Sequence, residues 1–220
     1  MDLKLLDHVE HSSKISIKNM KIGPKYKIAR RLGAPIFEKT QGAKYALSLT
    51  RKEKNIKGRQ KPKSEYGKQL LEKQKARFSY GVSEKQFSKY TKVSLNAPEP
   101  LQKLFRSLEM RLDNVLYRSG LAKTRASGRQ MAAHGHATVN GKRVTIPSML
   151  LKIGDEVGIR GGSVESPLFN DAEERMNTQA APSWIELDPK KKVSKVAGLP
   201  NYVPGEQLFD LGVVLEFYSR

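Results

Sequence analysis

Apolar residues between positions 101 and 116 recur at steps of three and four, the spacing of one face of an α-helix. The stripe consists of Leu101, Leu104, Phe105, Leu108, Leu112, Val115 and Leu116. Gly120 follows, and a glycine past the last turn commonly ends a helix. Thr124 can cap a second, shorter helix that runs through Met131 to Ala133, and Gly135 can end it. The pattern therefore predicts one continuous helix followed by a short one.

A hairpin signal follows these two helices. Ala137 and Val139 alternate with polar positions, and an Asn140-Gly141 turn leads into a second run at 143–145. Residues 153–156 read as a further turn and residues 157–159 as a short strand, before Gly161-Gly162. We expect a small curved sheet packed against two helices.

Two more helices are predicted at 64–95, ahead of the apolar stripe. Ser64 can cap the first, and Ser83 with Gln86 forms a capping-box pattern for the second. Aromatic residues at helical spacing here, such as Phe87 and Tyr90, belong to a core more often than to a base-stacking surface.

The last part of the chain mixes helical and extended patterns. Residues 168–181 could form one more helix, and Trp184, Ile185 and Leu187 alternate as in a strand. Residues 213–218 read as an apolar strand or extended segment. An apolar end must be covered, so we expect it to return and pack on the helices of 64–95.

The predicted fold class is α+β: a mainly helical basic N-terminal domain plus a small α/β module with short antiparallel strands. Ala97-Pro98-Glu99-Pro100 is the clearest linker, because a residue before proline disfavours helix. We predict a flexible extension at 1–19, a basic helical domain at 20–97 completed by 185–220, and a second domain at 98–184 with its core motif at 109–160.

Charge changes this picture most. The 220 residues contain 41 Lys and Arg against 22 Asp and Glu, a net charge of +19. Between Lys18 and Lys92 there are 22 basic and 5 acidic residues, so nearly all of the excess lies in the first half. This balance indicates a polyanionic partner, most simply nucleic acid.

Other classes of function find little support. The absence of cysteine excludes disulfides and thiolate metal sites. No apolar run is long enough for a membrane span, and Asp2, Asp7 and Glu10 argue against a signal or transit peptide, so we expect a cytoplasmic protein rather than an organelle one. His134 and His136 have no further candidate ligands near them, and we expect them to form hydrogen bonds rather than bind a metal. We find no nucleophile elbow and no phosphate loop, and we expect no enzyme activity, no cofactor, no membrane and no small-molecule substrate.

Several stretches resemble one known family. RLDNVLYRSG, then TRASGRQ, then HATVNG resemble the RNA-binding domain of the S-four family of small-subunit ribosomal proteins. The flanks MKIGPKYKIARRLG, PKSEYGKQLLEKQKARFSYGVSEKQFSKY and VVLEFYSR resemble the ribosomal protein itself, so the likeness covers about residues 20–220. The family usually has alanine at Gly128, and a glycine inside a helix costs roughly 1 kcal/mol. A zinc site found in some members has no counterpart here.

The resemblance implies a structural constituent of the small ribosomal subunit. Such a protein binds rRNA early at a 5′-domain helix junction, lines the mRNA entry channel, contributes to translational accuracy, and contacts a neighbouring small-subunit protein of the S-five family. The mRNA role would fall to Arg59, Lys61 and Lys63. The alternatives are a free RNA-binding regulator or chaperone with the same module, or an accessory domain of an RNA-modifying enzyme.

The predicted RNA contacts are mostly cations on helix faces and turns. They are Lys21, Lys25, Lys27, Arg30, Arg31, Lys44, Arg51, Arg59, Lys61, Lys63, Tyr66, Lys68, Lys73, Lys75, Arg77, Lys85, Lys89, Arg111, Arg118, Lys123, Arg125, Arg129, His134, Asn140, Lys142 and Arg143.

Overall fold

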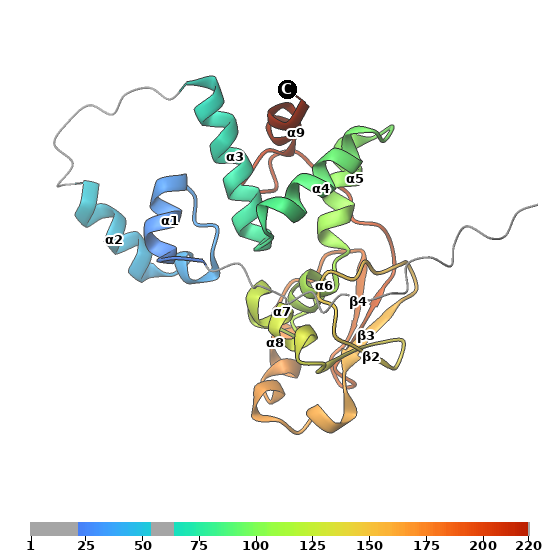
Figure 1. The fold of residues 1–220 in the computed structure, drawn as a ribbon. Coiled ribbons are helices and arrows are strands. Elements are labelled where there is room, and N and C mark those ends of the chain that lie inside the picture. The colour runs from blue at the N-terminus through green and yellow to red at the C-terminus, as the bar shows by residue number, and fades with distance from the viewer. Residues whose placement is uncertain (1–21, 54–63, 220) are drawn as a thin grey trace, which may run out of the picture.

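The computed structural model describes residues 22–53 and 64–219, which form a helical part and a mixed part (Figure 1). The helical part consists of α1 (Lys25–Leu32), α2 (Ala43–Glu53), α3 (Glu65–Tyr80), α4 (Glu84–Leu95), α5 (Pro100–Glu109) and α9 (Leu211–Ser219). In Figure 1, α3, α4, α5 and α9 gather above the sheet, and α1 and α2 lie to one side of α3. No helix in these two described ranges is long and apolar enough to cross a bilayer.

The mixed part is one antiparallel sheet with helices packed on it. Its helices are α6 (Leu112–Arg118), α7 (Arg125–Ala133) and α8 (Ala172–Thr178). Its strands are β1 (Ala137–Val139), β2 (Lys142–Val144), β3 (Glu156–Ile159), β4 (Ile185–Asp188) and β5 (Val193–Val196), in the order β2-β1-β3-β5-β4. The α+β class is confirmed. Strand β5 had no clear sequence signal of its own.

The helix ends follow the predicted caps. The hydroxyls of Ser64, Ser83 and Thr124 each accept a backbone N–H of the next helix, and Thr124 forms a full capping box with Ser127. Asn140 and Gly141 both have positive φ, at 51° and 75°, which is the geometry of the predicted hairpin turn.

The single helix predicted at 101–116 is wrong, because the chain breaks between α5 and α6. Arg111 is extended, with φ −71° and ψ 138°, and forms a bridge with Leu150. The amides of Leu112 and Asp113 then donate to Met149 O and Pro147 O at 2.9 and 3.0 Å. Tertiary hydrogen bonds therefore replace helical ones at this point, although the apolar period continues through it.

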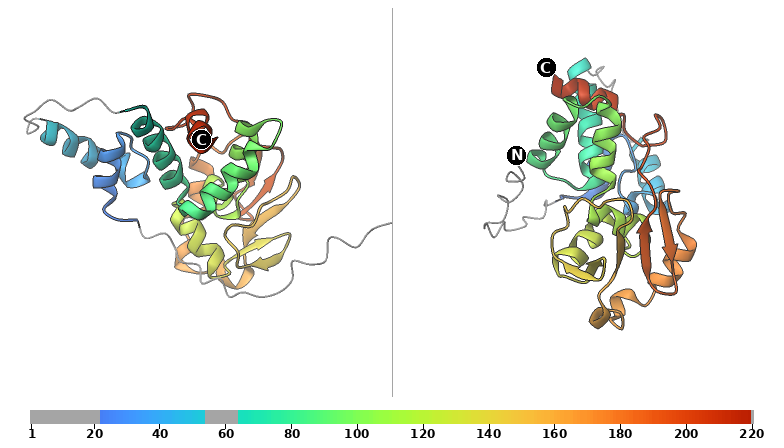
Figure 2. Two further views of the ribbon diagram at one scale, coloured as in Figure 1. Left: turned by 45° about the horizontal axis from the view of Figure 1, so that its top comes forward. Right: turned by 90° about the vertical axis from the view of Figure 1, so that its right-hand side faces the viewer.

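The C-terminal segment is the second correction, because it is the helix α9 and not a strand. Leu211, Val214 and Leu215 are buried at helical spacing, a period that the β-branched pair Val213-Val214 conceals. The expected docking is confirmed, since α9 packs on α3, α4 and α5 (Figure 2). The range 185–220 does not stay together, because β4 and β5 join the sheet and only the later residues reach the helices. The helix expected at 168–181 is shorter and covers only α8, after a 3₁₀ turn at Pro167–Phe169.

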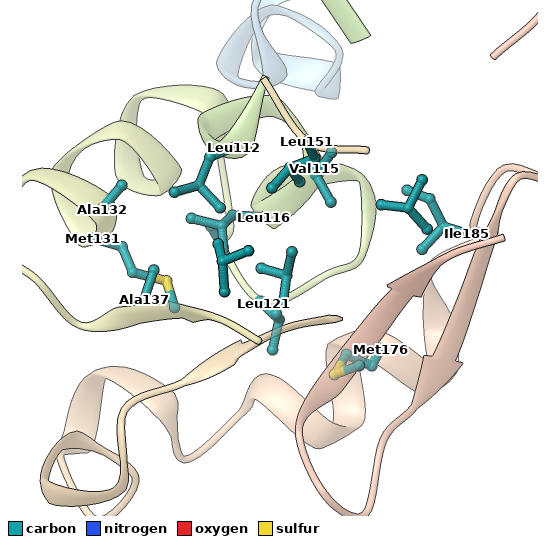
Figure 3. Close-up of a cluster of buried hydrophobic side chains, with 14 of the residues drawn as sticks. Leu112, Val115, Leu116, Leu121, Met131, Ala132, Ala137, Leu151, Met176 and Ile185 are labelled. Atoms are coloured by element: carbon teal, nitrogen blue, oxygen red, sulfur yellow. The ribbon is translucent and has the colours of Figure 1, made fainter. Parts of the chain in front are cut away.

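Each of the two parts has an apolar cluster of its own. The sheet and α6, α7 and α8 share a core that includes Leu112, Leu116 and Met131 (Figure 3). Trp184 belongs to the same core. A second cluster joins α3, α4, α5 and α9, and Phe87 is fully buried in it. The prediction that the aromatic residues of this region are core residues is therefore confirmed for Phe87.

Gly128 has a packing role that its sequence position does not reveal. A Cβ atom placed there would lie 2.5 Å from Asp113 O, which belongs to the backbone of α6. The glycine therefore lets α6 and α7 approach closely, which offsets the helix propensity that it lacks.

Candidate nucleic-acid interface

A buried ion cluster links α6 and α7. The Asp113 carboxylate accepts hydrogen bonds from Arg111 Nε and Nη2 at 3.0 and 2.8 Å, and from Arg129 Nε and Nη2 at 2.9 and 2.7 Å. The Asp113 and Arg111 side chains are only 3% and 2% exposed. Arg111 also donates to Tyr90 Oη at 2.7 Å. Two cations thus share one carboxylate away from water.

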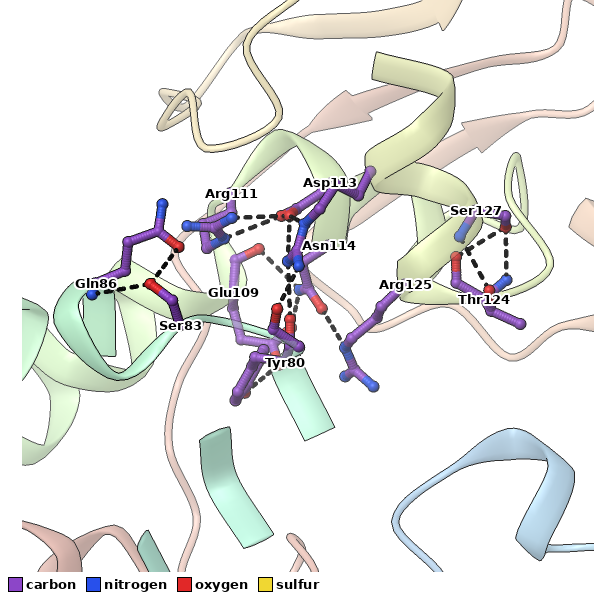
Figure 4. Close-up of polar contacts among 12 residues, drawn as sticks. Tyr80, Ser83, Gln86, Glu109, Arg111, Asp113, Asn114, Thr124, Arg125 and Ser127 are labelled. Atoms are coloured by element: carbon purple, nitrogen blue, oxygen red, sulfur yellow. Dashed lines mark hydrogen bonds and ion pairs between the residues drawn. The ribbon is translucent and has the colours of Figure 1, made fainter. Parts of the chain in front are cut away.

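A second cluster surrounds Glu109 at the end of α5 (Figure 4). Its carboxylate accepts hydrogen bonds from Tyr80 Oη at 2.7 Å, Asn114 Nδ2 at 2.8 Å, and Arg118 Nε and Nη2 at 2.9 and 2.8 Å. Burial alone would raise the pKa of Glu109, but the Arg118 charge and these hydrogen bonds outweigh it and lower that pKa. Burial and the Glu109 charge raise the pKa of Tyr80.

These two ion clusters join the helical part to the mixed part. Arg129, on α7, donates to Gly81 O and, at 3.0 Å, to Tyr80 O, both at the end of α3. Tyr80 reaches in turn to Glu109. The end of α3 is therefore held by hydrogen bonds on both sides of the break between α5 and α6.

Burial corrects two of the predicted RNA contacts. Arg111 is buried against Asp113, and the Lys73 side chain is 9% exposed with its Nζ atom 2.8 Å from Glu84 Oε1. Each of these two cations is buried and already pairs with a carboxylate, so neither is an exposed charge that could neutralise a phosphate. Both are structural residues, and the amphipathic pattern did not reveal this because it places them on polar helix positions.

The other predicted residues divide by exposure. Exposed cations are Lys27, Arg31, Lys44, Arg51, Lys68, Lys85, Lys89, Lys123, Lys142 and Arg143. Half-buried ones are Lys25, Arg30, Lys75, Arg77, Arg118, Arg125 and Arg129. Tyr66 and His134 are also exposed. Asn140, in the hairpin turn, donates to Asp155 Oδ1 and accepts a hydrogen bond from the Glu156 amide at the start of β3. Lys21, Arg59, Lys61 and Lys63 lie outside the described residues.

The exposed cations are poorly neutralised. Lys68 pairs with Glu65 at 3.4 Å and Lys123 with Asp171 at 3.0 Å, and the other exposed cations just named form no ion pair with a carboxylate in the described ranges. They come from α1, α2, α3, α4, the α6–α7 loop and the hairpin, and most of these elements are helices. Such a surface can neutralise closely spaced phosphates in a fixed pattern.

The two histidines of this region, His134 and His136, are the remaining candidates for site chemistry. No group of three His, Asp or Glu side chains that could hold a metal occurs in the described part of the chain. The rings of His134 and His136 are 6.1 Å apart, and His136 Nδ1 lies 3.0 Å from Ser163 Oγ, which fits the expected hydrogen-bonding role for His136.

Comparisons with known proteins identify the family of this chain. The family described as "Ribosomal protein S4/S9 N-terminal domain" matches residues 20–115, and the one described as "S4 domain" matches residues 110–157. Proteins named "Small ribosomal subunit protein uS4" are similar over nearly their whole length. The one from Roseiflexus castenholzii is 39% identical over 202 residues, and the one from Aquifex aeolicus is 40% identical over 206; each alignment covers 90% of this chain and 98% of the relative. With a helical N-terminal part, a small antiparallel module and this similarity, the chain belongs to the uS4 family of small ribosomal subunit proteins.

Proposed function

We propose that this chain is a structural, non-enzymatic component of the small ribosomal subunit that binds rRNA through its exposed cations. The observation that carries the proposal is the set of unneutralised Lys and Arg side chains on rigid elements, in a chain whose relatives are named small ribosomal subunit proteins. Because the helices hold these cations in place, the protein recognises the shape of folded RNA more than its base sequence.

The finer role follows the family resemblance. The protein binds a helix junction of the rRNA 5′ domain early in assembly, lines the mRNA entry channel with Arg59, Lys61 and Lys63, and contacts the S-five protein. High positive charge in the first half of the chain supports the rRNA and mRNA parts of this proposal.

Cosedimentation and RNA binding test the main claim. The protein should sediment with small subunits at moderate salt, and should bind 5′-domain junction RNA more tightly than an arbitrary duplex of equal length. A protein that stays at the top of the gradient would instead be a free regulator or chaperone. A pseudouridylation assay should detect no activity.

The channel role has its own test. Arg59→Gln combined with Lys61→Gln should reduce crosslinking of mRNA to the protein in programmed subunits. Lys190→Gln, in the exposed loop between β4 and β5, is the matched control and should leave the crosslink unchanged. Equal crosslinking in all three proteins would refute the assignment of 59–63 to the channel.

A further inference from the structure

Arg125 is held differently from the other half-buried cations. It is the first residue of α7, and its Nε donates to Asn114 Oδ1 at 2.7 Å. Its guanidinium carbon lies 5.0 Å from the Tyr80 ring centre and 4.6 Å from the Tyr117 ring centre. One polar contact and two aromatic rings therefore fix the plane of the guanidinium.

The residue that orients Arg125 is itself locked. Asn114 is 2% exposed, and its Nδ2 donates to Glu109 O and Glu109 Oε2 at 3.0 and 2.8 Å. Because the amide nitrogen is committed to Glu109, the amide oxygen must face Arg125. The ion cluster around Glu109 thus sets the direction of a cation that it does not bind directly.

The outer end of Arg125 is open to a ligand. Within the described ranges, neither of its terminal nitrogens has a hydrogen-bond partner, and neither is among the buried atoms that lack one. Arg125 lines a cleft of about 220 Å³ together with Gly81, Arg129, and Lys25 and Glu38. The last two come from α1 and from the 3₁₀ turn at Glu38–Thr40, which together are called the α1 segment below. In Figure 4 the guanidinium extends away from Asn114.

We propose that Arg125 is a fixed two-pronged site for one phosphate group of the RNA backbone, in the cleft between the end of α3, the start of α7 and the α1 segment. The proposal rests on the rRNA-binding function proposed above. Planar guanidinium matches two phosphate oxygens, and Lys25 and the positive end of α7 add to the attraction. Glu38 opposes it, and Arg129 adds less than a free cation because its Nε and Nη2 atoms already donate to Asp113. A phosphate held here would bind the α1 segment and the module at once.

Two pairs of variants in the full-length protein test this with a 5′-domain rRNA fragment. Arg125→Lys keeps the charge but loses the planar fork, so its Kd should rise about tenfold, the scale of a charge-assisted hydrogen bond. Arg160→Lys, an exposed arginine outside the cleft, is the control and should change the Kd less than about twofold, as expected of a weakly constrained surface cation.

The second pair tests positioning without changing charge. Tyr117→Phe keeps the ring over Arg125 and should bind like the original protein, whereas Tyr117→Leu should weaken binding severalfold with an unchanged salt dependence. Unfolding followed by Trp184 fluorescence verifies that each variant is folded.

The outcomes separate the two proposals. If the unmodified protein prefers its rRNA fragment but Arg125→Lys binds that fragment as tightly as the unmodified protein, the two-pronged phosphate site is refuted. The proposed rRNA binding then still stands. If Tyr117→Leu matches Tyr117→Phe, the aromatic rings do not position Arg125. If the unmodified protein shows no preference for the rRNA fragment, the proposed function itself fails.

Discussion

Replacing Asp113 by asparagine should destabilise the protein strongly, because its carboxylate is the shared ion-pair partner of the buried Arg111 and the half-buried Arg129. Asparagine has nearly the same shape, so the change removes charge and leaves no cavity. The four hydrogen bonds from Arg111 and Arg129, at 2.7–3.0 Å, would lose their anionic acceptor. Removing one partner of a buried ion pair costs about 3–5 kcal/mol. That is a large share of the ~5–15 kcal/mol that typically stabilises a domain.

Urea unfolding provides the measurement. Trp184 is 8% exposed in the same core as Leu112, and it is the protein's single tryptophan, so its fluorescence reports this part of the fold. Asp171→Asn is the matched control, because Asp171 pairs with Lys123 while both side chains are more than half exposed. We expect a large fall in the midpoint for Asp113→Asn and little change for Asp171→Asn. If the two variants unfold at the same urea concentration, the buried cluster does not stabilise the protein.

Three further predictions concern single positions. Gly128→Ala should lower the free energy of unfolding by about 1–2 kcal/mol, because the new Cβ atom would meet Asp113 O. This cost outweighs the better helix propensity of alanine. A higher free energy of unfolding in urea would instead show that α6 and α7 separate easily. Because the pKa of Glu109 is lower in the folded protein, its contribution to stability is complete above its unfolded value of about 4.3 and is lost as pH falls through the folded pKa. The difference in unfolding midpoint between the original protein and Glu109→Gln should therefore shrink in acid, and a constant difference would contradict the shift. Leu211→Ala, at a fully buried position of α9, should cost about 2–5 kcal/mol in urea unfolding, whereas a cost under about 1 kcal/mol would mean that α9 is not firmly docked.

The sequence predicted best what depends on neighbouring residues. The cap at Thr124 and the Asn140-Gly141 turn are set by side chains a few positions away, and both formed as expected. The break at Arg111 and the helix α9 were missed, because each depends on partners far along the chain. The chain leaves the helix at Arg111 to pair with residues 147–150, and α9 becomes helical where Leu211 and its neighbours meet α3, α4 and α5.

The same distinction applies to the candidate site. Charge counting predicted a surface for polyanions, but it could not separate cations that face water from cations that face Asp113 or Glu84. The residues that hold Arg125 gave no signal at all, because Asn114 and Tyr117 acquire that role only when α6 and α7 pack together. The individual RNA contacts stay predictions.

Buried cations affect RNA binding in a different way from exposed ones. An exposed lysine such as Lys89 releases counterions when it meets a phosphate, so it contributes to the slope of affinity against salt. Arg111 is already neutralised by Asp113 in the free protein and releases none. Replacing Arg111 by glutamine can therefore weaken binding only by disturbing the fold, with the salt slope unchanged, whereas Lys89→Gln should reduce that slope by about one phosphate contact. Salt titration thus separates the cations that contact RNA phosphates from those that stabilise the fold of the protein.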